Sequence, residues 1–98
     1  MKVNICGIPH EVVEYDDIFN ANAIHFGQIN YKACKISISK DMTEEMKNEA
    51  LCHEILHGIL VHLGYGDQSN DEQFVQALAS AINQGFVVKM IDGNGKGD

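Results

Sequence analysis

Arginine is absent from this chain of 98 residues, whose 7 basic residues are all lysines. Arginine is the side chain that makes bidentate contacts with phosphate groups and guanine bases. The 14 acidic residues give a formal net charge of −7, and no basic cluster replaces the missing guanidinium groups. We therefore expect no binding to nucleic acid or to other acidic partners.

Paired cysteines and long apolar runs are also lacking. Cys6, Cys34 and Cys52 are widely spaced, odd in number and without a CxxC motif, which argues against a disulfide framework and favours a reducing cytoplasm. No stretch approaches the roughly 18 apolar residues of a membrane span. Residues 1–5 are not followed by an apolar run long enough for a signal peptide. We expect a cytoplasmic protein that neither crosses nor binds a membrane.

The first half of the chain predicts a small sheet. Residues 34–39 alternate strictly between apolar and polar side chains, which is typical of a strand with one buried face. A short connection at 31–33 predicts a hairpin with a strand at 26–31. Residues 10–15 are rich in β-formers and predict a third strand, whereas residues 7–9 break the extended run that precedes it. The expected sheet is three-stranded and mostly antiparallel.

The second half predicts two long helices with a 3.6-residue apolar period. The first begins at Asp41 or Thr43 and runs to about Leu63. The second follows a reversing loop and continues through the glycine at position 85 to about residue 90, although residues 86–91 could also form a strand. We expect one domain at residues 1–91 and a disordered, glycine-rich tail at 92–98.

Three residues in the middle of the first predicted helix form an HExxH motif: His53, Glu54 and His57. Residues four apart lie on one helical face, so both imidazoles can bind one metal ion. The glutamate next to the first histidine can reach water bound to that ion. The motif alone is common, and an ordinary helix with two surface histidines is the alternative. The position of these histidines at the border of an apolar arc favours a metal site.

A catalytic zinc ion needs a third protein ligand, and we predict that it is Glu72 at the start of the second helix. Asp71 is the rival, although its position suits a helix N-cap. His62 falls within the apolar arc of the first helix and is expected to be a partly buried packing residue, and Cys52 is expected in the core. Gln76, one turn after Glu72, is expected to hydrogen-bond a ligand imidazole.

The HExxH motif at 53–57 is followed by the sequence E-x-x-V-Q-x-L-A at 72–79. Together they resemble the gluzincin arrangement of the ImmA/IrrE-like metallopeptidases, whose second motif is similar to E-x-x-A-N-x-F-A. The predicted hairpin at 26–39 and the helix start at Thr43 also resemble small, often phage-encoded members of this family. The resemblance covers roughly residues 10–91. The valine and glutamine at 75 and 76 replace the usual small residue and asparagine.

The resemblance implies a minimal zincin-like α+β fold, with the sheet packed on two long helices. It further implies a phage or mobile-element protein that cleaves an intracellular protein in a bacterial or phage-infected cell. In zincins of this kind an edge strand holds the extended substrate peptide, and residues 26–31 or 34–39 would take that role here.

The residues themselves allow metal-assisted hydrolysis of a peptide bond. One Zn²⁺ per chain, held by His53, His57 and Glu72, would lower the pKa of its water towards about 7. Glu54 would act as the general base. The available donors for stabilising the oxyanion are Tyr31, Tyr65, His25 and His62. The oligomeric state is not indicated by the sequence.

Two other functions fit the sequence. A non-catalytic binding module could keep the zincin scaffold with a structural metal, since 98 residues leave little wall for a substrate cleft. The retention of Glu54 argues against it, because a structural site needs no general base. In the other alternative, the HExxH motif is a coincidence in a small helical interaction protein.

Overall fold

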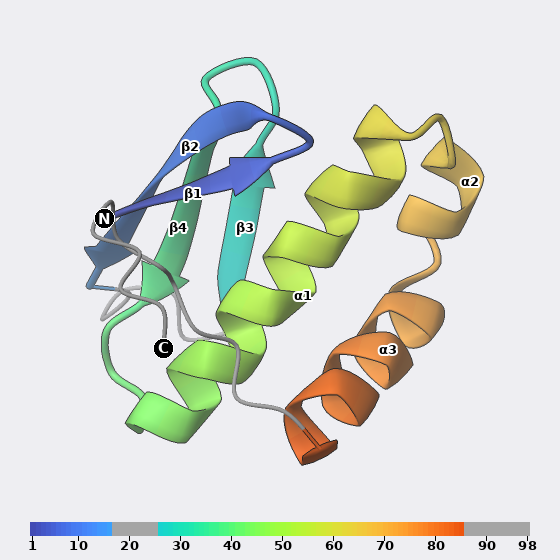
Figure 1. Cartoon of the computed structure of the whole chain (residues 1–98). Helices are drawn as coiled ribbons and strands as arrows, with labels where there is room; N and C mark the ends of the chain where they lie inside the picture. Colours follow the sequence, from blue (N-terminus) through green and yellow to red (C-terminus); the bar gives the residue numbers. More distant parts are fainter. Residues whose placement is uncertain (17–25, 86–98) are drawn as a thin grey trace, which may run out of the picture.

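A long central helix separates a small mixed sheet from a second helix (Figure 1). The computed structural model describes residues 1–16 and 26–85 of the chain, and within them the fold is α+β. The elements, in chain order, are β1 (Lys2–Ile5), β2 (Ile8–Tyr15), β3 (Gly27–Asn30), β4 (Lys35–Ser39), α1 (Glu44–His62), α2 (Gly66–Ser69) and α3 (Glu72–Gly85).

The sheet has four strands in the order β1-β2-β4-β3, so the prediction of three strands is wrong. The additional strand is β1, which pairs antiparallel with β2 across a two-residue turn. Cys6 and Gly7 in this turn have φ angles of 51° and 84°, the positive values that a type I′ hairpin turn requires. The predicted break at residues 7–9 is therefore a hairpin turn followed by strand, and Pro9 lies within β2 opposite Asn4.

The two hairpins of the sheet join through a parallel pair. β3 and β4 form the predicted antiparallel hairpin, with Ile29 opposite Ile36. β2 then pairs in parallel with β4, with Val12 opposite Ile36, so the sheet is mixed. This order leaves β1 and β3 as the two edge strands and places β4 in the interior.

One face of the sheet and one face of α1 enclose the apolar core. α1 approaches the sheet closely at Gly58, where an added Cβ would lie 2.9 Å from Cδ1 of Ile5 and 3.1 Å from Cδ1 of Ile29. A larger residue at position 58 would push the helix away from the strands. The buried members of the core are Val3, Ile5, Val12, Ile36, Ile38, Ala50 and Leu51, with Ile29, Met42, Ile55 and Ile59 packed against them.

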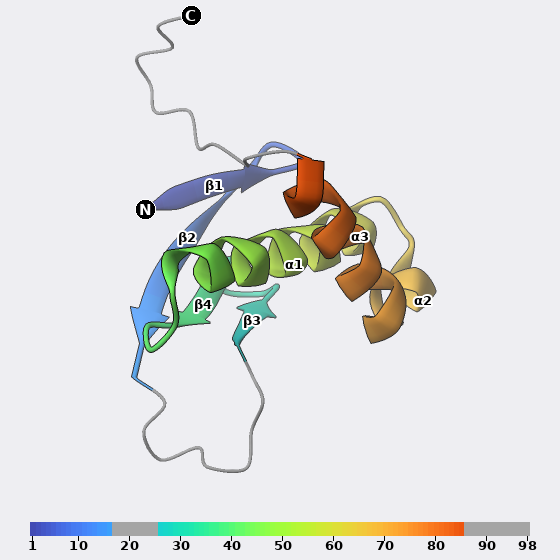
Figure 2. The same cartoon turned by 90° about the horizontal axis from the view of Figure 1, so that it is seen from below.

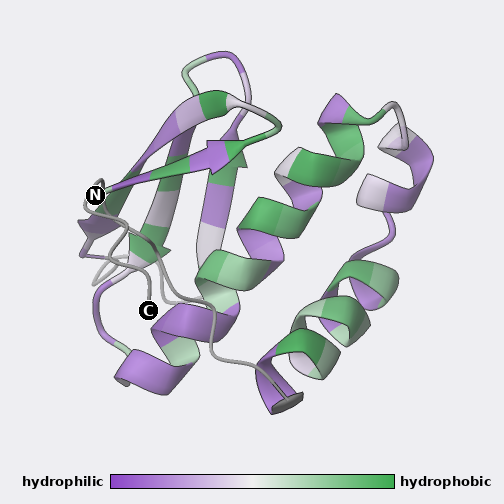
Figure 3. Cartoon of the chain, in the orientation of Figure 1, coloured by the Kyte–Doolittle hydropathy of each residue, from purple (hydrophilic) through white to green (hydrophobic). Residues whose placement is uncertain are grey.

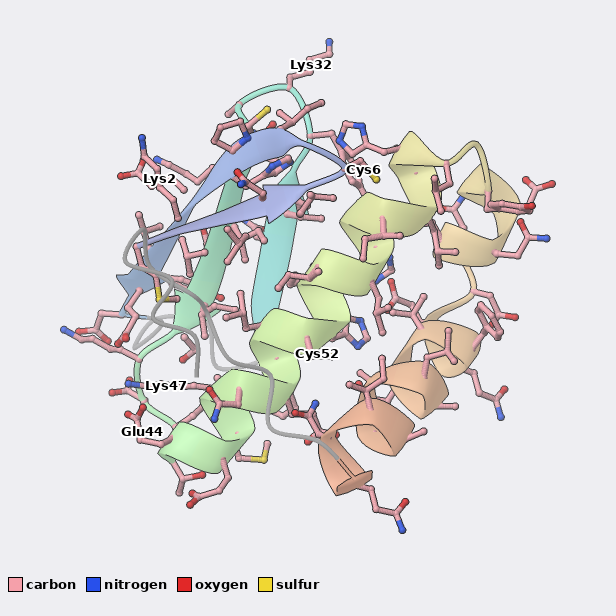
Figure 4. The ribbon with its side chains drawn as sticks, viewed as in Figure 1. Lys2, Cys6, Lys32, Glu44, Lys47 and Cys52 are labelled. Carbon is pink, nitrogen blue, oxygen red and sulfur yellow. The ribbon has the colours of Figure 1, made fainter. Side chains whose placement is uncertain are left out.

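α1 begins and ends close to the predicted residues. Its N-cap is Thr43, whose Oγ1 accepts a hydrogen bond of 3.2 Å from the backbone N–H of Met46. Its C-cap is Leu63, and Gly64 follows with a φ angle of 89°. In the first turn, Lys47 lies 3.0 Å from Glu14 at the end of β2 and 3.5 Å from Glu44 (Figure 4). This ion-paired lysine connects the start of the helix to the sheet.

The helices after α1 differ from the prediction of two long helices. The reversing loop contains the short helix α2, which the sequence pattern did not indicate. α3 has 14 residues in its described part and packs on α1 and α2. The predictions for residues 86–91 and for the tail at 92–98 lie outside the described residues. No helix in the described ranges combines the length and the apolar character needed to cross a bilayer.

Candidate metal centre

His53 and His57 project from one side of α1, one turn apart, towards α3. Their ring centroids are 4.8 Å apart and their planes are inclined by 60°. Both lie on the side of α1 that faces away from the sheet and towards α3. The hydropathy of α1 is accordingly mixed along its length, with hydrophilic residues interrupting the hydrophobic ones (Figure 3).

Glu72 is the residue that meets the two histidines. It is the first residue of α3, and α2 brings that helix back alongside α1. Oε1 of Glu72 lies 2.9 Å from Nε2 of His53 and 3.2 Å from Nε2 of His57. The ligand atoms of the three residues all lie within 4.8 Å of one another. The structure thus brings together the three residues that the sequence proposed as metal ligands.

Two hydrogen bonds on the far side of the rings determine where the imidazole protons lie. Nδ1 of His53 is 2.8 Å from Oε1 of Gln76, and Nδ1 of His57 is 3.1 Å from Oγ of Ser69. The Ser69 hydroxyl donates to the backbone carbonyl of His57 at 3.3 Å, so its oxygen accepts from the ring. Both Nδ1 atoms therefore donate, and in the neutral imidazoles each Nε2 carries a lone pair.

This donor set fits a divalent cation such as zinc. The two Nε2 atoms lie 3.1 Å apart beside the Glu72 carboxylate, and all three groups present electron pairs to the same space. Such atoms repel one another unless a cation lies among them. Two imidazoles and one carboxylate are a ligand set that zinc accepts, with a fourth position left for water or substrate. His53, His57 and Glu72 could therefore hold a metal ion.

Asp71 caps α3: its Oδ1 accepts a 3.0 Å hydrogen bond from the backbone N–H of Phe74. It does not belong to the cluster of potential metal ligands in the described residues. Burial and the two histidines set the acidity of Glu72. Burial raises the pKa of its carboxyl. When the two imidazoles are protonated, however, their Nε2–H groups hydrogen-bond the carboxylate and their charges attract it, and together these effects hold the pKa below its ordinary value.

The other two candidate ligands lie elsewhere. His62 is exposed, so the prediction of a partly buried residue is wrong. It is the last residue of α1, and its ring packs edge-on against His10 at a centroid distance of 5.8 Å. Cys52 is buried as predicted, and burial raises the pKa of its thiol.

Glu54 lies beside the cluster in a buried setting, with 7% of its surface exposed. Desolvation raises the pKa of its carboxyl to about 7; the charge of His53 lowers it and that of Glu72 raises it further. A carboxyl with this pKa can both accept and release a proton near neutral pH. Gly27 on β3 makes room for it, because an added Cβ there would lie 3.4 Å from Cγ of Glu54 and 2.9 Å from the Ser37 carbonyl.

A pocket of about 680 Å³ opens over the cluster between β3, α1 and α3. Its lining comprises Phe26, Gly27, Gln28, Ile29, Tyr31, Met46, Glu49, Ala50, His53, Glu54, His57, Asn70, Glu72 and Gln76. The edge strand β3 therefore borders the pocket, whereas β4 is paired on both sides. Of the four predicted oxyanion donors, Tyr31 lines the pocket, His62 and Tyr65 are not in its lining, and His25 lies outside the described residues.

Sequence reasoning missed three residues of the site: Ser69, which contacts His57, and Glu49 and Ser80, which contact Gln76. Glu49 and Ser80 each lie one helical turn from a recognised site residue, His53 and Gln76 respectively. Extending both motifs by four residues would have found them. Ser69 comes from α2, whose position depends on tertiary structure, so no local signal identified it.

Comparisons of the chain with protein-family models, with curated proteins and with solved structures give no match. The function must therefore be argued from the site itself.

Proposed function

We propose that the chain is a zinc-dependent metallopeptidase that hydrolyses a peptide bond of an intracellular protein, with one zinc ion per chain. The observation that carries the proposal is the position of Glu54. A buried carboxyl whose pKa is about 7 lines the same pocket as the three potential ligands. A purely structural metal site has no need of such a group.

His53, His57 and Glu72 would hold the zinc ion, in keeping with the donor set they present. When bound, zinc supplies a Lewis acid that acidifies water and polarises a carbonyl group. Glu54 takes the proton of the attacking water as general base and later delivers it to the leaving amine. Its burial supports both steps, because a carboxyl with a pKa near 7 is suited to each direction of transfer.

The substrate is best accommodated as an extended peptide along β3. This edge strand borders the pocket and has one side without a strand partner in the described sheet, so a peptide can add to it through main-chain hydrogen bonds. Tyr31 is the tyrosine of the pocket wall, and its hydroxyl is our candidate for stabilising the oxyanion. The ImmA/IrrE-like resemblance of the two motifs supports the same reaction class.

The test is Glu54→Gln, which keeps the shape of the side chain and removes the base. We expect the variant to bind about one zinc per chain like the wild type, measured by elemental analysis of untagged protein. Its hydrolysis of a broad peptide library should fall by a factor of roughly 10² to 10⁴. The matched control is the exposed Glu45→Gln on the same helix, which should leave hydrolysis unchanged.

Other outcomes would favour the alternatives. Zinc binding without hydrolysis in the wild-type protein would replace the peptidase by a non-catalytic binding module with a structural metal. Absence of zinc even after reconstitution would contradict both, and would leave a helical interaction protein in which HExxH is coincidental.

A further inference from the structure

The polar contacts between α1 and α3 extend beyond the proposed metal ligands. On α1, Glu49, His53 and His57 follow one another at intervals of four residues, and so share one face. On α3, Glu72, Gln76 and Ser80 do the same. Because α1 and α3 pack against each other, these two rows of three polar residues lie side by side. We call this set of six residues the polar seam.

The hydrogen bonds of the seam run in antiparallel order. His57 and His53 contact Glu72, His53 contacts Gln76, and Gln76 contacts Glu49. Glu49 is half-buried at the end of the seam away from Glu72. It reaches the proposed metal ligands only through the side chain of Gln76.

Glu49 and Ser80 together hold the amide of Gln76. Oε2 of Glu49 accepts a 2.8 Å hydrogen bond from Nε2 of Gln76 and a 2.9 Å hydrogen bond from the hydroxyl of Ser80. Nε2 of Gln76 also donates to Oγ of Ser80 at 3.0 Å. Both hydrogens of the amide nitrogen are therefore directed to the Glu49 and Ser80 oxygens.

The chemistry of Glu49 allows only one orientation of that amide. An ionised carboxylate accepts hydrogen bonds and donates none. The NH₂ end of Gln76 must therefore face Glu49, because the opposite orientation would bring two oxygens within 2.8 Å of each other. The carbonyl end then faces His53, whose Nδ1 must donate across the 2.8 Å contact. Nε2 of His53 is left with its lone pair towards Glu72.

We propose that Glu49 is a positioning residue of the metal centre: through Gln76 it selects the tautomer of His53 whose Nε2 lone pair is available to a metal ion. The inference rests on the metal site of the proposed function, and does not depend on the reaction carried out there. Ser69 selects the same tautomer of His57 independently. Each imidazole is thus set by a different element, α3 for His53 and α2 for His57.

The decisive variant is Glu49→Lys. An ammonium group at this position donates only, so it demands the carbonyl end of Gln76. The amide turns, its NH₂ faces Nδ1 of His53, and the imidazole proton moves to Nε2, where it points at Glu72. We expect zinc to bind about 10- to 100-fold more weakly than to wild type, the range found when partners of ligand histidines are lost. Affinity is measured by competition with a chromophoric chelator.

Glu45→Lys is the matched control. It makes the same change of charge on α1, at an exposed residue outside the seam. A loss of zinc affinity in Glu45→Lys equal to that in Glu49→Lys would overturn the proposal, because general electrostatics would then explain the effect.

Exchanging the carboxylate of Glu49 and the amide of Gln76 distinguishes a positioning role of Glu49 from a role in packing α1 against α3. Gln76→Glu alone sets two carboxylates against each other, and should weaken zinc binding or the fold. In the double variant Glu49→Gln/Gln76→Glu, the carboxylate at position 76 accepts from both Nδ1 of His53 and the new amide at position 49. We expect zinc affinity to return to the wild-type level or above. Affinity in the double variant that is no better than in Gln76→Glu would contradict the proposal.

The tautomer can be observed directly in protein without metal. The ¹⁵N shifts of the His53 ring, recorded at about pH 8.5 where neutral imidazole is the ordinary form, should show Nδ1–H in wild type and Nε2–H in Glu49→Lys. The same tautomer in both proteins would overturn the inference. This measurement stands apart from the peptidase proposal, which fails if wild type binds zinc but cleaves no peptide, with the tautomer result unaffected.

Discussion

The two sides of α1 are built from opposite kinds of contact. Towards the sheet the helix presents Leu51, Ile55 and Ile59, and Gly58 lets the strands approach to van der Waals distance. Towards α3 it presents Glu49, His53 and His57 of the polar seam, which hydrogen-bond to partners on α2 and α3. α3 adds two buried apolar residues to this layer, Val75 and Ala79. Viewed from below, α1 lies between the two layers that these sides serve (Figure 2).

The difference between the two sides suggests separate roles: the apolar side stabilises the fold, and the polar side positions the proposed metal ligands. The apolar side depends on shape, since each buried methyl group contributes and none has a directional partner. The polar side depends on direction, since each of its histidines is oriented by a hydrogen bond to a serine or an amide. We expect changes on the first side to alter the free energy of unfolding, and changes on the second to alter metal affinity. Three predictions test this division, in decreasing order of effect.

Ile36→Ala should have the largest effect on stability. Ile36 is fully buried at the centre of the core, on the strand that is paired on both sides. The substitution should lower the free energy of unfolding by about 2–5 kcal/mol, and the control Ile36→Val by about 0.5–1.5 kcal/mol, as measured by urea denaturation. Zinc affinity of the folded fraction should be unchanged in Ile36→Val. A loss of affinity there would mean that the two sides of α1 are coupled.

Glu54 lies close to Gly27 of the sheet and also lines the pocket with the two histidines. The pH dependence of the free energy of unfolding tests whether its burial affects the stability of the fold. Burial raises the pKa of its carboxyl from 4.5 to about 7, so between these values the folded protein holds a proton that the unfolded chain has lost. Stability of the metal-free protein should therefore fall as the pH rises through that window. Glu54→Gln removes the ionisable group, and should be more stable than wild type by on the order of 3 kcal/mol above pH 7.

The advantage of Glu54→Gln should shrink as the pH is lowered through the same window, because the wild-type carboxyl then becomes neutral. Thermal unfolding at pH 5 and pH 8 in the presence of a chelator measures both values. The exposed Glu45→Gln is the control. An equal change in both variants would show that burial of Glu54 is not responsible.

Zinc should give the smallest of the three effects, and it acts on the polar side alone. At a free zinc concentration of about 100 times Kd, binding to the folded state adds about 2.7 kcal/mol to the free energy of unfolding. This gain should disappear in His57→Ala and persist in Ile36→Val. A zinc-dependent rise in Tm that survives His57→Ala would place the binding site elsewhere.

The sequence predicted the apolar side of α1 and the grouping of His53, His57 and Glu72, and their role as metal ligands stays a prediction. Spacing by three or four residues on a helix explains the border position of His53 and His57, and it places Gln76 one turn after Glu72. The return of Glu72 follows from the reversing loop, which brings α3 back beside α1. Asp71 as N-cap and Cys52 as a core residue follow from the same local reasoning. These features depend on little beyond secondary structure.

The errors occurred where tertiary contacts decide the structure. β1 is short, and its turn contains Cys6 in a left-handed conformation that is uncommon for cysteine, so the hairpin had no usual turn signature. The parallel pairing of β2 with β4 joins residues more than 20 positions apart and leaves no trace in either strand. His62 is exposed although its ring packs edge-on against His10 of β2, and the helical period does not show how much of a side chain such a contact covers.

The interior position of β4 has a consequence for how the molecule assembles. β1–β2 and β3–β4 are local hairpins that can each close early, but an isolated two-stranded hairpin is marginal in water. Neither hairpin is stabilised by the other until β2 and β4 pair, and this pairing joins residues more than 20 positions apart along the chain. Docking of the hairpins, with α1 covering the joined face, is therefore the step that we expect to limit the folding rate. The edge strand at the pocket would acquire its final position only after that step, so the pocket would form late.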